Sequence, residues 1–162
     1  MKKSLFAPDA VFISKETSRD GVFKDVAAQL LQKGYVKDDF LCNLKEREDN
    51  YPTGIDITPI STELDNVAIP HTEGEFVNAR LIVPVKLEQE VTFKNMIMPD
   101  EELSVKFLFM ILNNDPEGQA NVLAQIMDFL SQTPVADLQK LFASEDTTAI
   151  YKFLAAHFKE DI

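Results

Sequence analysis

The sequence contains no tryptophan, one cysteine, two histidines and five glycines among its 162 residues. A single cysteine excludes an intrachain disulfide and is typical of a protein of the reducing cytoplasm. Five glycines are few for a protein with a glycine-rich nucleotide-binding loop, and neither GxGxxG nor a P-loop motif occurs. No apolar run approaches the roughly 20 residues of a membrane span, and none follows Lys2 and Lys3 as in a signal peptide. We therefore expect a cytoplasmic protein that does not insert into the membrane.

The residue patterns of common metal and hydrolase sites are missing too. HExxH, CxxC and Cys/His clusters do not occur, so no metal and no bound cofactor is expected. The GxSxG motif of serine hydrolases is also absent. The 27 acidic residues outnumber the 16 basic ones and give a formal net charge of −11. This charge argues against nucleic acid and against an anionic membrane surface as partners.

The residues that are present have the patterning of one α/β domain over residues 1–162. Helical spacing of apolar residues, or a helix start signal, predicts five helices: at 18–34, at 38–49, at 115–131, and from residues 133 and 144 onward. Strands are predicted where β-branched and aromatic residues gather, at 55–57, 67–69, 79–87, 91–93 and 105–112. Pro84 interrupts one of these strands and predicts a sheet edge or a bulge there. The order of elements favours a single sheet with helices packed on it.

The most informative stretch of the chain is VAIPHTE, at residues 67–73. An apolar run that stops at a proline predicts a strand ending at Ile69, with His71 presented just beyond the strand end. An imidazole has a pKa near neutrality and can act as a nucleophile without a separate base. The polar, loop-forming neighbours favour this role over a histidine that only packs in a loop. Glu73 or Glu75 could accept a hydrogen bond from one ring nitrogen and leave the other free.

Arg47 is the second candidate residue, and it has both a structural and a functional interpretation. As a surface residue it would form ion pairs with Glu46 or Glu48 that contribute little. Beside a histidine, its guanidinium would neutralise a phosphoryl group, because it forks onto two oxygens and keeps its charge. Sequence spacing alone does not bring Arg47 next to His71. The other histidine, His157, lies on the apolar stripe of the last predicted helix and is interpreted as structural.

Three segments together carry a resemblance to a known family: KERE at 45–48, YPTGI at 51–55 and VAIPH at 67–71. They resemble the IIA domains of the bacterial phosphoenolpyruvate-dependent sugar phosphotransferase system (PTS), in the mannitol/fructose/nitrogen-type (EIIA type 2) superfamily. The resemblance extends over nearly the whole chain. It implies a three-layer α/β/α sandwich around a mixed sheet of about five strands, with His71 in a shallow exposed groove.

The resemblance also implies an activity, that of a phosphotransferase acting as a phosphohistidine relay. His71 would take a phosphoryl group from the phosphocarrier protein HPr, and Arg47 would help to hold that group. The group would then pass to a IIB subunit that works with the membrane component IIC. Thr72 and Glu73 are further predicted substrate-binding residues. The same resemblance leaves open a regulatory protein of the nitrogen type, whose phosphorylation state controls a protein partner, and an inactive module of the same fold.

Gln119 departs from the pattern of the superfamily. Many members carry a second active-site histidine near this position, whereas a glutamine can donate a hydrogen bond to a phosphoryl oxygen but adds no positive charge. With a glutamine at this position and Glu73 two residues after His71, the sequence most resembles the free-standing galactitol-specific IIA proteins. The sequence therefore predicts uptake of galactitol or a related polyol, with a tentative substrate-binding role for Gln119.

Overall fold

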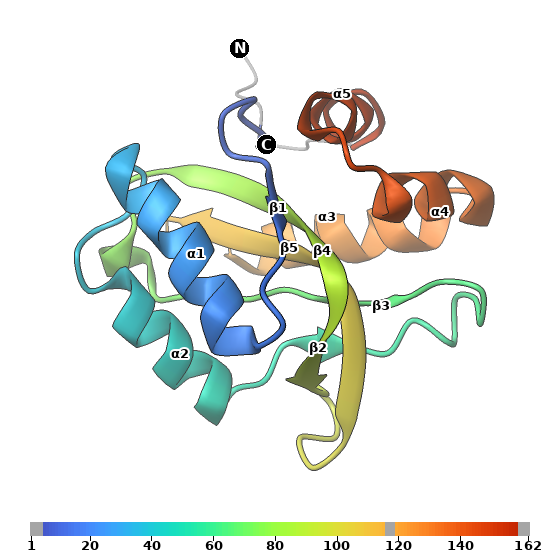
Figure 1. Ribbon diagram of the computed structural model, residues 1–162, viewed down its shortest axis with the longest axis horizontal. Coiled ribbons are helices and arrows are strands. Elements are labelled where there is room, and N and C mark those ends of the chain that lie inside the picture. Colours follow the sequence, from blue (N-terminus) through green and yellow to red (C-terminus); the bar gives the residue numbers. More distant parts are fainter. Residues whose placement is uncertain (1–4, 116–118, 159–162) are drawn as a thin grey trace.

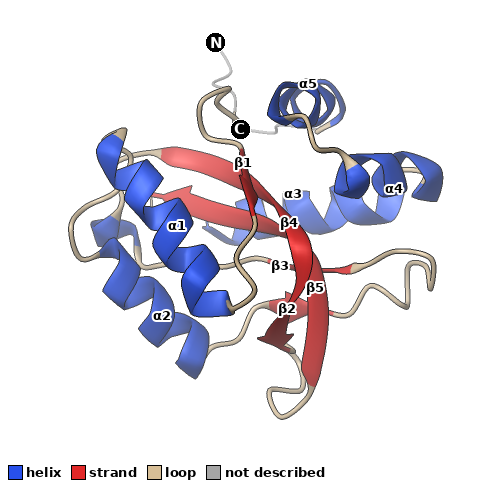
Figure 2. Ribbon diagram, viewed as in Figure 1, coloured by secondary structure: helices blue, strands red, loops and turns tan. Residues whose placement is uncertain are grey.

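A five-stranded mixed sheet, in the order β1-β4-β5-β3-β2, runs through the computed structural model, which describes residues 5–115 and 119–158 (Figure 2). The strands are β1 (Phe12–Ser14), β2 (Gly54–Ile55), β3 (Asn66–Ala68), β4 (Arg80–Lys94) and β5 (Glu102–Asn113). β4 and β5 are antiparallel, as are β2 and β3, whereas β1 runs parallel to β4 and β3 parallel to β5. The mixed sheet that the sequence predicts is thus confirmed.

Helices cover both faces of this sheet (Figure 1). One face is covered by α1 (Arg19–Gln32) and α2 (Phe40–Asn50). The other is covered by α3 (Gln119–Gln132), α4 (Val135–Ala143) and α5 (Thr147–His157). A short 3-10 helix, η1 (Gly74–Phe76), lies between β3 and β4. The predicted three-layer α/β/α sandwich is therefore confirmed as well.

The central strand β5 explains why the molecule has two cores. Its side chains alternate between the two faces of the sheet, as in any strand. Leu108, Met110 and Leu112 pack with the α1 and α2 side, whereas Phe109 and Ile111 pack with the α3, α4 and α5 side. Because both sets are buried, the sequence of β5 is a nearly continuous apolar run rather than an alternating one.

Local signals fix the helices that carry the site. The hydroxyl of Ser18 accepts a hydrogen bond from the Gly21 N–H at 3.0 Å and caps the start of α1. Shortly after α1, Gly34 adopts a φ of 81°, a left-handed conformation that glycine tolerates best. In α2, every fourth residue from Phe40 is buried, and this spacing places Glu48 on the buried face of the helix.

The structure corrects the predicted strands at 79–87 and 91–93, which form one strand, β4. A register irregularity between Lys86 and Val91 accounts for the apparent break. Pro84 lies neither at a sheet edge nor at this bulge, because β4 is an inner strand and Pro84 is in register with Phe109 of β5. It falls between Ile82, whose N–H donates to the Leu5 carbonyl oxygen, and the three residues from Val85 onward that pair with β1.

Gly54 marks a close approach between β2 and the end of β4. A Cβ atom at this position would lie 2.6 Å from the Lys94 carbonyl oxygen, too close for the backbone to remain in place. We expect Gly54→Ala to lower the free energy of unfolding by about 1–3 kcal/mol, the usual cost of overpacking, in urea denaturation. The control is Gly34→Asn, because no atom lies within 4 Å of that position and asparagine tolerates its positive φ. Equal losses in the two variants would contradict the close approach.

Candidate active site

His71 is placed by a continuation of β3 along β5. The Pro70 carbonyl oxygen accepts a hydrogen bond from the Ile111 N–H at 3.0 Å, and His71 forms an isolated parallel bridge with Ile111. The backbone therefore stays in sheet register for three residues beyond Ala68, the last residue of β3. This rigid attachment presents the partly exposed side chain of His71 at the end of a buried strand, as the sequence predicts.

The ring of His71 is held in one tautomer. Its Nδ1 atom lies 2.9 Å from the carbonyl oxygen of Ile69. A carbonyl oxygen only accepts hydrogen bonds, so Nδ1 carries the proton and the neutral ring has its lone pair on Nε2. The prediction that Glu73 or Glu75 accepts this bond is wrong, because the backbone two residues upstream already does so. Nε2 is left as the ring atom with a lone pair available for a nucleophilic role.

The surroundings of His71 keep its ring neutral. Burial lowers the pKa of His71 below its ordinary value, and the positive charge of Arg47 adds to this effect. The hydrogen bond to Ile69 and the negative charge of Glu73 oppose it. Since the net shift is downward, the unprotonated ring that a nucleophile requires persists at neutral pH.

Arg47 reaches the same region from α2. Its Nη1 atom lies 2.6 Å from Oε1 of Glu73, two residues after His71, and its guanidinium lies 5.3 Å from the centroid of the Tyr51 ring. The Nε atom of Arg47 is buried without a hydrogen-bond partner among residues 5–115 and 119–158. The structure thus brings Arg47 close to His71, which the spacing in the sequence could not establish, and leaves an N–H donor unused.

The other predicted residues differ in what the structure says of them. The Thr72 hydroxyl is buried and donates to the Glu73 carbonyl oxygen at 2.9 Å. Gln119 is the first residue of α3, and its side chain lies outside the described part of the chain. The binding roles of Thr72 and Gln119 stay predictions. His157 is not on the buried face of α5 as expected: it is exposed, and its ring stacks on Phe153 at 4.3 Å.

The sequence did not lead us to predict Glu48 and Thr53 as residues of the site. Glu48 is 4% exposed, and its carboxylate accepts hydrogen bonds from the N–H and the hydroxyl of Thr53 at 2.7 and 2.8 Å. Burial raises the pKa of Glu48, and the two bonds from Thr53 oppose this rise. The signal was present in the spacing, since Glu48 follows Leu44 by four residues on the buried face of α2.

Neither a metal-binding cluster nor a membrane-spanning helix is found in the part of the chain that the structure describes. Residues 5–115 and 119–158 contain no group of three or more His, Cys, Asp or Glu side chains arranged to hold a metal ion. Within the same residues, every helix is too short or too polar to cross a membrane.

The charges around His71 predict opposite effects of two substitutions. Arg47→Gln removes a positive charge and should raise the pKa of His71, whereas Glu73→Gln removes a negative charge and should lower it further. Titration of the His71 ring signals by NMR measures both shifts. His157, stacked on Phe153 in α5, is the internal reference that neither substitution should disturb. A fall in the pKa of His71 in Arg47→Gln would contradict the proximity of the two side chains.

Two named relatives share limited identity with this chain. The transcriptional regulator ManR of Bacillus subtilis is 26% identical over 135 residues, which are 83% of this chain but only 18% of ManR. This chain therefore spans less than a fifth of the length of that relative. The PTS system galactitol-specific EIIA component of Escherichia coli is 25% identical over 119 residues, 74% of this chain and 75% of the relative.

Solved structures share the fold. The nitrogen regulatory protein IIA-Ntr of Neisseria meningitidis aligns with a TM-score of 0.69 at 18% identity, over 93% of this chain and 96% of that one. IIA mannitol of Escherichia coli, in a complex with phosphorylated enzyme IIB mannitol, aligns with a TM-score of 0.70 at 16% identity, over 93% and 97%. These similarities establish the fold alone.

A family model settles the membership of the chain. The model described as "Phosphoenolpyruvate-dependent sugar phosphotransferase system, EIIA 2" matches residues 4–157, and this range includes every residue of the site. The predicted membership of this superfamily is confirmed, and with it a phosphotransfer role at the level of the family. The chain belongs to the EIIA type 2 family of the phosphoenolpyruvate-dependent sugar phosphotransferase system.

Proposed function

We propose that this chain is a cytoplasmic phosphoryl carrier that accepts a phosphoryl group from phospho-HPr on Nε2 of His71. It then passes the group to a IIB subunit, which works with a membrane IIC component during uptake of galactitol or a related polyol. The observation that carries the proposal is the neutral ring of His71, fixed at Nδ1 by the Ile69 carbonyl oxygen and flanked by Arg47. One domain over residues 1–162 performs both transfers.

The contacts of the site support each step of this transfer. The Nε2 lone pair attacks phosphorus, and the bond between phosphorus and the donor atom breaks as the new N–P bond forms. Nδ1 keeps its proton and its bond to Ile69, so no proton has to leave the ring. The unpartnered Nε of Arg47 can donate to a phosphoryl oxygen. Positioning and charge neutralisation are the main requirements of phosphoryl transfer, and these residues provide both.

The named relatives support the choice of partner and substrate class. IIA mannitol, which shares the fold, forms a complex with a phosphorylated IIB protein, and we infer a IIB partner for this chain by analogy. A galactitol-specific EIIA component covers 74% of this chain, and on this basis we assign a polyol as the transported substrate. In the proposed function Thr72 and Gln119 complete the binding of the phosphoryl group, whereas the Glu73 carboxylate takes part through its ion pair with Arg47.

A second candidate function is regulation without sugar uptake. The relatives include a transcriptional regulator and a nitrogen regulatory protein, each similar to more than four fifths of this chain. In that function the phosphorylation state of His71 would be read by a protein partner instead of being discharged onto a IIB subunit. Transfer of the phosphoryl group from this chain to a purified galactitol-type IIB protein separates the two functions.

Phosphorylation of His71 tests the proposed function directly. We expect incubation with phosphoenolpyruvate, enzyme I and HPr to add one acid-labile phosphoryl group to the wild type and none to His71→Ala, measured by intact mass. His157→Ala is the matched control and should be labelled like the wild type, because that histidine lies exposed on α5. Label retained by His71→Ala, or no label on the wild type, would overturn the proposal.

Replacing Arg47 should slow phosphoryl transfer far more than breaking its ion pair with Glu73 does. We expect Arg47→Ala to slow phosphorylation by about 100-fold, as loss of a preorganised donor to a developing charge does in other enzymes. Glu73→Gln removes the same ion pair but keeps the guanidinium, so its rate should stay near that of the wild type. Rapid-quench kinetics with phospho-HPr measure both rates. Equal slowing in the two variants would assign Arg47 a structural role only.

A further inference from the structure

A chain of hydrogen bonds connects Glu48 with the ring of His71. The Glu48 carboxylate accepts from the N–H of Thr53 at 2.7 Å and from its hydroxyl at 2.8 Å. The Thr53 carbonyl oxygen accepts from the Ile69 N–H at 3.2 Å. The Ile69 carbonyl oxygen in turn accepts from Nδ1 of His71 at 2.9 Å. The carboxylate is thus joined to the proposed nucleophile through two residues of the backbone.

Glu48 also lies next to the cation of the site in the sequence. Arg47 and Glu48 are neighbours on α2, but their side chains point to different places: Arg47 to Glu73 and Glu48 to Thr53. The first contact joins α2 to the segment that follows His71, and the second joins α2 to the turn that holds the segment before it. Both sides of His71 are therefore tied to one turn of the same helix.

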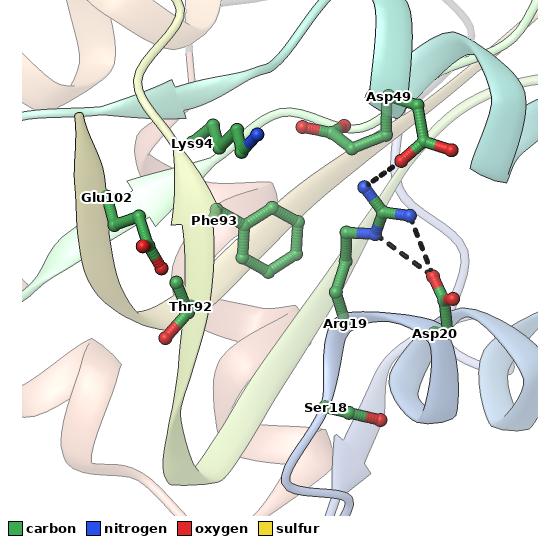
Figure 3. A pocket seen from close by; sticks show the side chains of 9 residues that line it. Ser18, Arg19, Asp20, Asp49, Thr92, Phe93, Lys94 and Glu102 are labelled. Atoms are coloured by element: carbon green, nitrogen blue, oxygen red, sulfur yellow. Dashed lines mark hydrogen bonds and ion pairs between the residues drawn. The ribbon is translucent and has the colours of Figure 1, made fainter. Parts of the chain in front are cut away.

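Arg19 anchors this end of α2 from α1. It forms ion pairs with Asp20 at 2.9 Å and with Asp49 at 2.8 Å, and Figure 3 shows its guanidinium between the two carboxylates. The residue that follows Glu48 is thus held by the start of α1. Because the buried side chains of Phe40 and Leu44 also hold α2 in the core, a bond from Glu48 can locate the turn at 52–54 instead of moving with it.

Packing alone does not explain a carboxylate at this position. Glu48 is buried, yet it lines a cavity of about 390 Å³ together with Phe93 and Lys94. A buried carboxylate costs free energy that a leucine on the same helix face would not, and an apolar side chain could extend into this space. The feature that a leucine could not supply is the pair of hydrogen bonds to Thr53.

We propose that Glu48 is a positioning residue for phosphoryl transfer, which acts through Thr53 and Ile69 to hold the ring of His71 in its Nδ1-protonated tautomer at a fixed place relative to Arg47. The proposal rests on the proposed function for its catalytic readout. Its structural content, that Glu48 controls the tautomer and orientation of a histidine 23 residues away in the sequence, stands independently. The proposal gives Glu48 and Thr53 no contact with the phosphoryl group.

The variants separate the hydrogen bonds from the bulk and the charge of Glu48. Glu48→Leu removes both acceptors and keeps much of the volume. Glu48→Gln keeps one oxygen for the Thr53 N–H, and its amide can donate to the Thr53 hydroxyl, so it should rescue the geometry without the charge. Thr53→Val removes the hydroxyl and leaves the backbone bond. Glu46→Leu, at an exposed position two residues away on α2, is the control for an acidic residue replaced by leucine.

Two readouts distinguish positioning from general support of the fold. The first is the ring ¹⁵N spectrum of His71, in which Glu48→Leu should move the proton from Nδ1 toward Nε2 while Glu48→Gln and Glu46→Leu leave it in place. The second is phosphorylation by phospho-HPr. We expect Glu48→Leu to lower kcat about 100-fold, as a displacement of about 1 Å can do, with KM changed less than about twofold. Glu48→Gln should recover most of this loss.

A double-mutant cycle tests whether the effect of Glu48 passes through Thr53. The losses in kcat of Glu48→Leu and Thr53→Val should not add in the double variant, because the hydroxyl bond that Thr53→Val removes is one of the two that Glu48→Leu also removes. Additive losses, or a folded Glu48→Leu with an unchanged ring spectrum and kcat, would overturn the proposal. If Glu48→Leu does not fold, unchanged ring spectrum and kcat in Thr53→Val would overturn it instead. Failure of the wild type to take up phosphate would reject the proposed function, while the ring spectra still decide the positioning role.

Discussion

The antiparallel pairing of β4 with β5 is the constraint on which the rest of the structure depends. β1 adds to the far side of β4 and β3 to the far side of β5, so both parallel neighbours take their register from this pair. Because β5 is buried on both faces, helices must cover both faces to remove its side chains from water. The place of His71 follows from the same pairing, since its backbone bridges to Ile111 of β5.

Burial has opposite consequences for His71 before and after the proposed transfer. Before transfer, desolvation lowers the pKa of the ring and keeps the Nε2 lone pair free for attack. After transfer, the same desolvation disfavours the negative charge of the phosphoryl group. Arg47 offsets this second effect, because it supplies a positive charge beside the ring in a chain whose net charge is −11. An arginine suits this position, since it keeps its charge and forks onto two oxygens.

His71 could be predicted from the sequence because a strand that stops at a proline is a local pattern. Its partners could not be predicted, since the contact of Arg47 with Glu73 joins residues 26 positions apart and depends on how α2 packs against the sheet. The bond from the ring to a backbone carbonyl was missed for a different reason, because only the turn geometry reveals it. Glu48 carried a detectable signal: it follows Leu44 on the buried face of α2, where a carboxylate must find donors.

A carrier must release its phosphoryl group as readily as it accepts it, and the contacts of Arg47 suit that requirement. Its ion pair with Glu73 joins side chains that are 28% and 56% exposed, so the pair contributes at most about 1 kcal/mol. The guanidinium can therefore exchange Glu73 for a phosphoryl oxygen at small cost, and Glu73 remains near enough to take it back. In the proposed mechanism Glu73 thus limits how strongly the phosphorylated state is stabilised, while Glu48 and Thr53 hold the ring in place. An arginine without a competing carboxylate would bind the phosphoryl group more tightly and slow its transfer to the next protein.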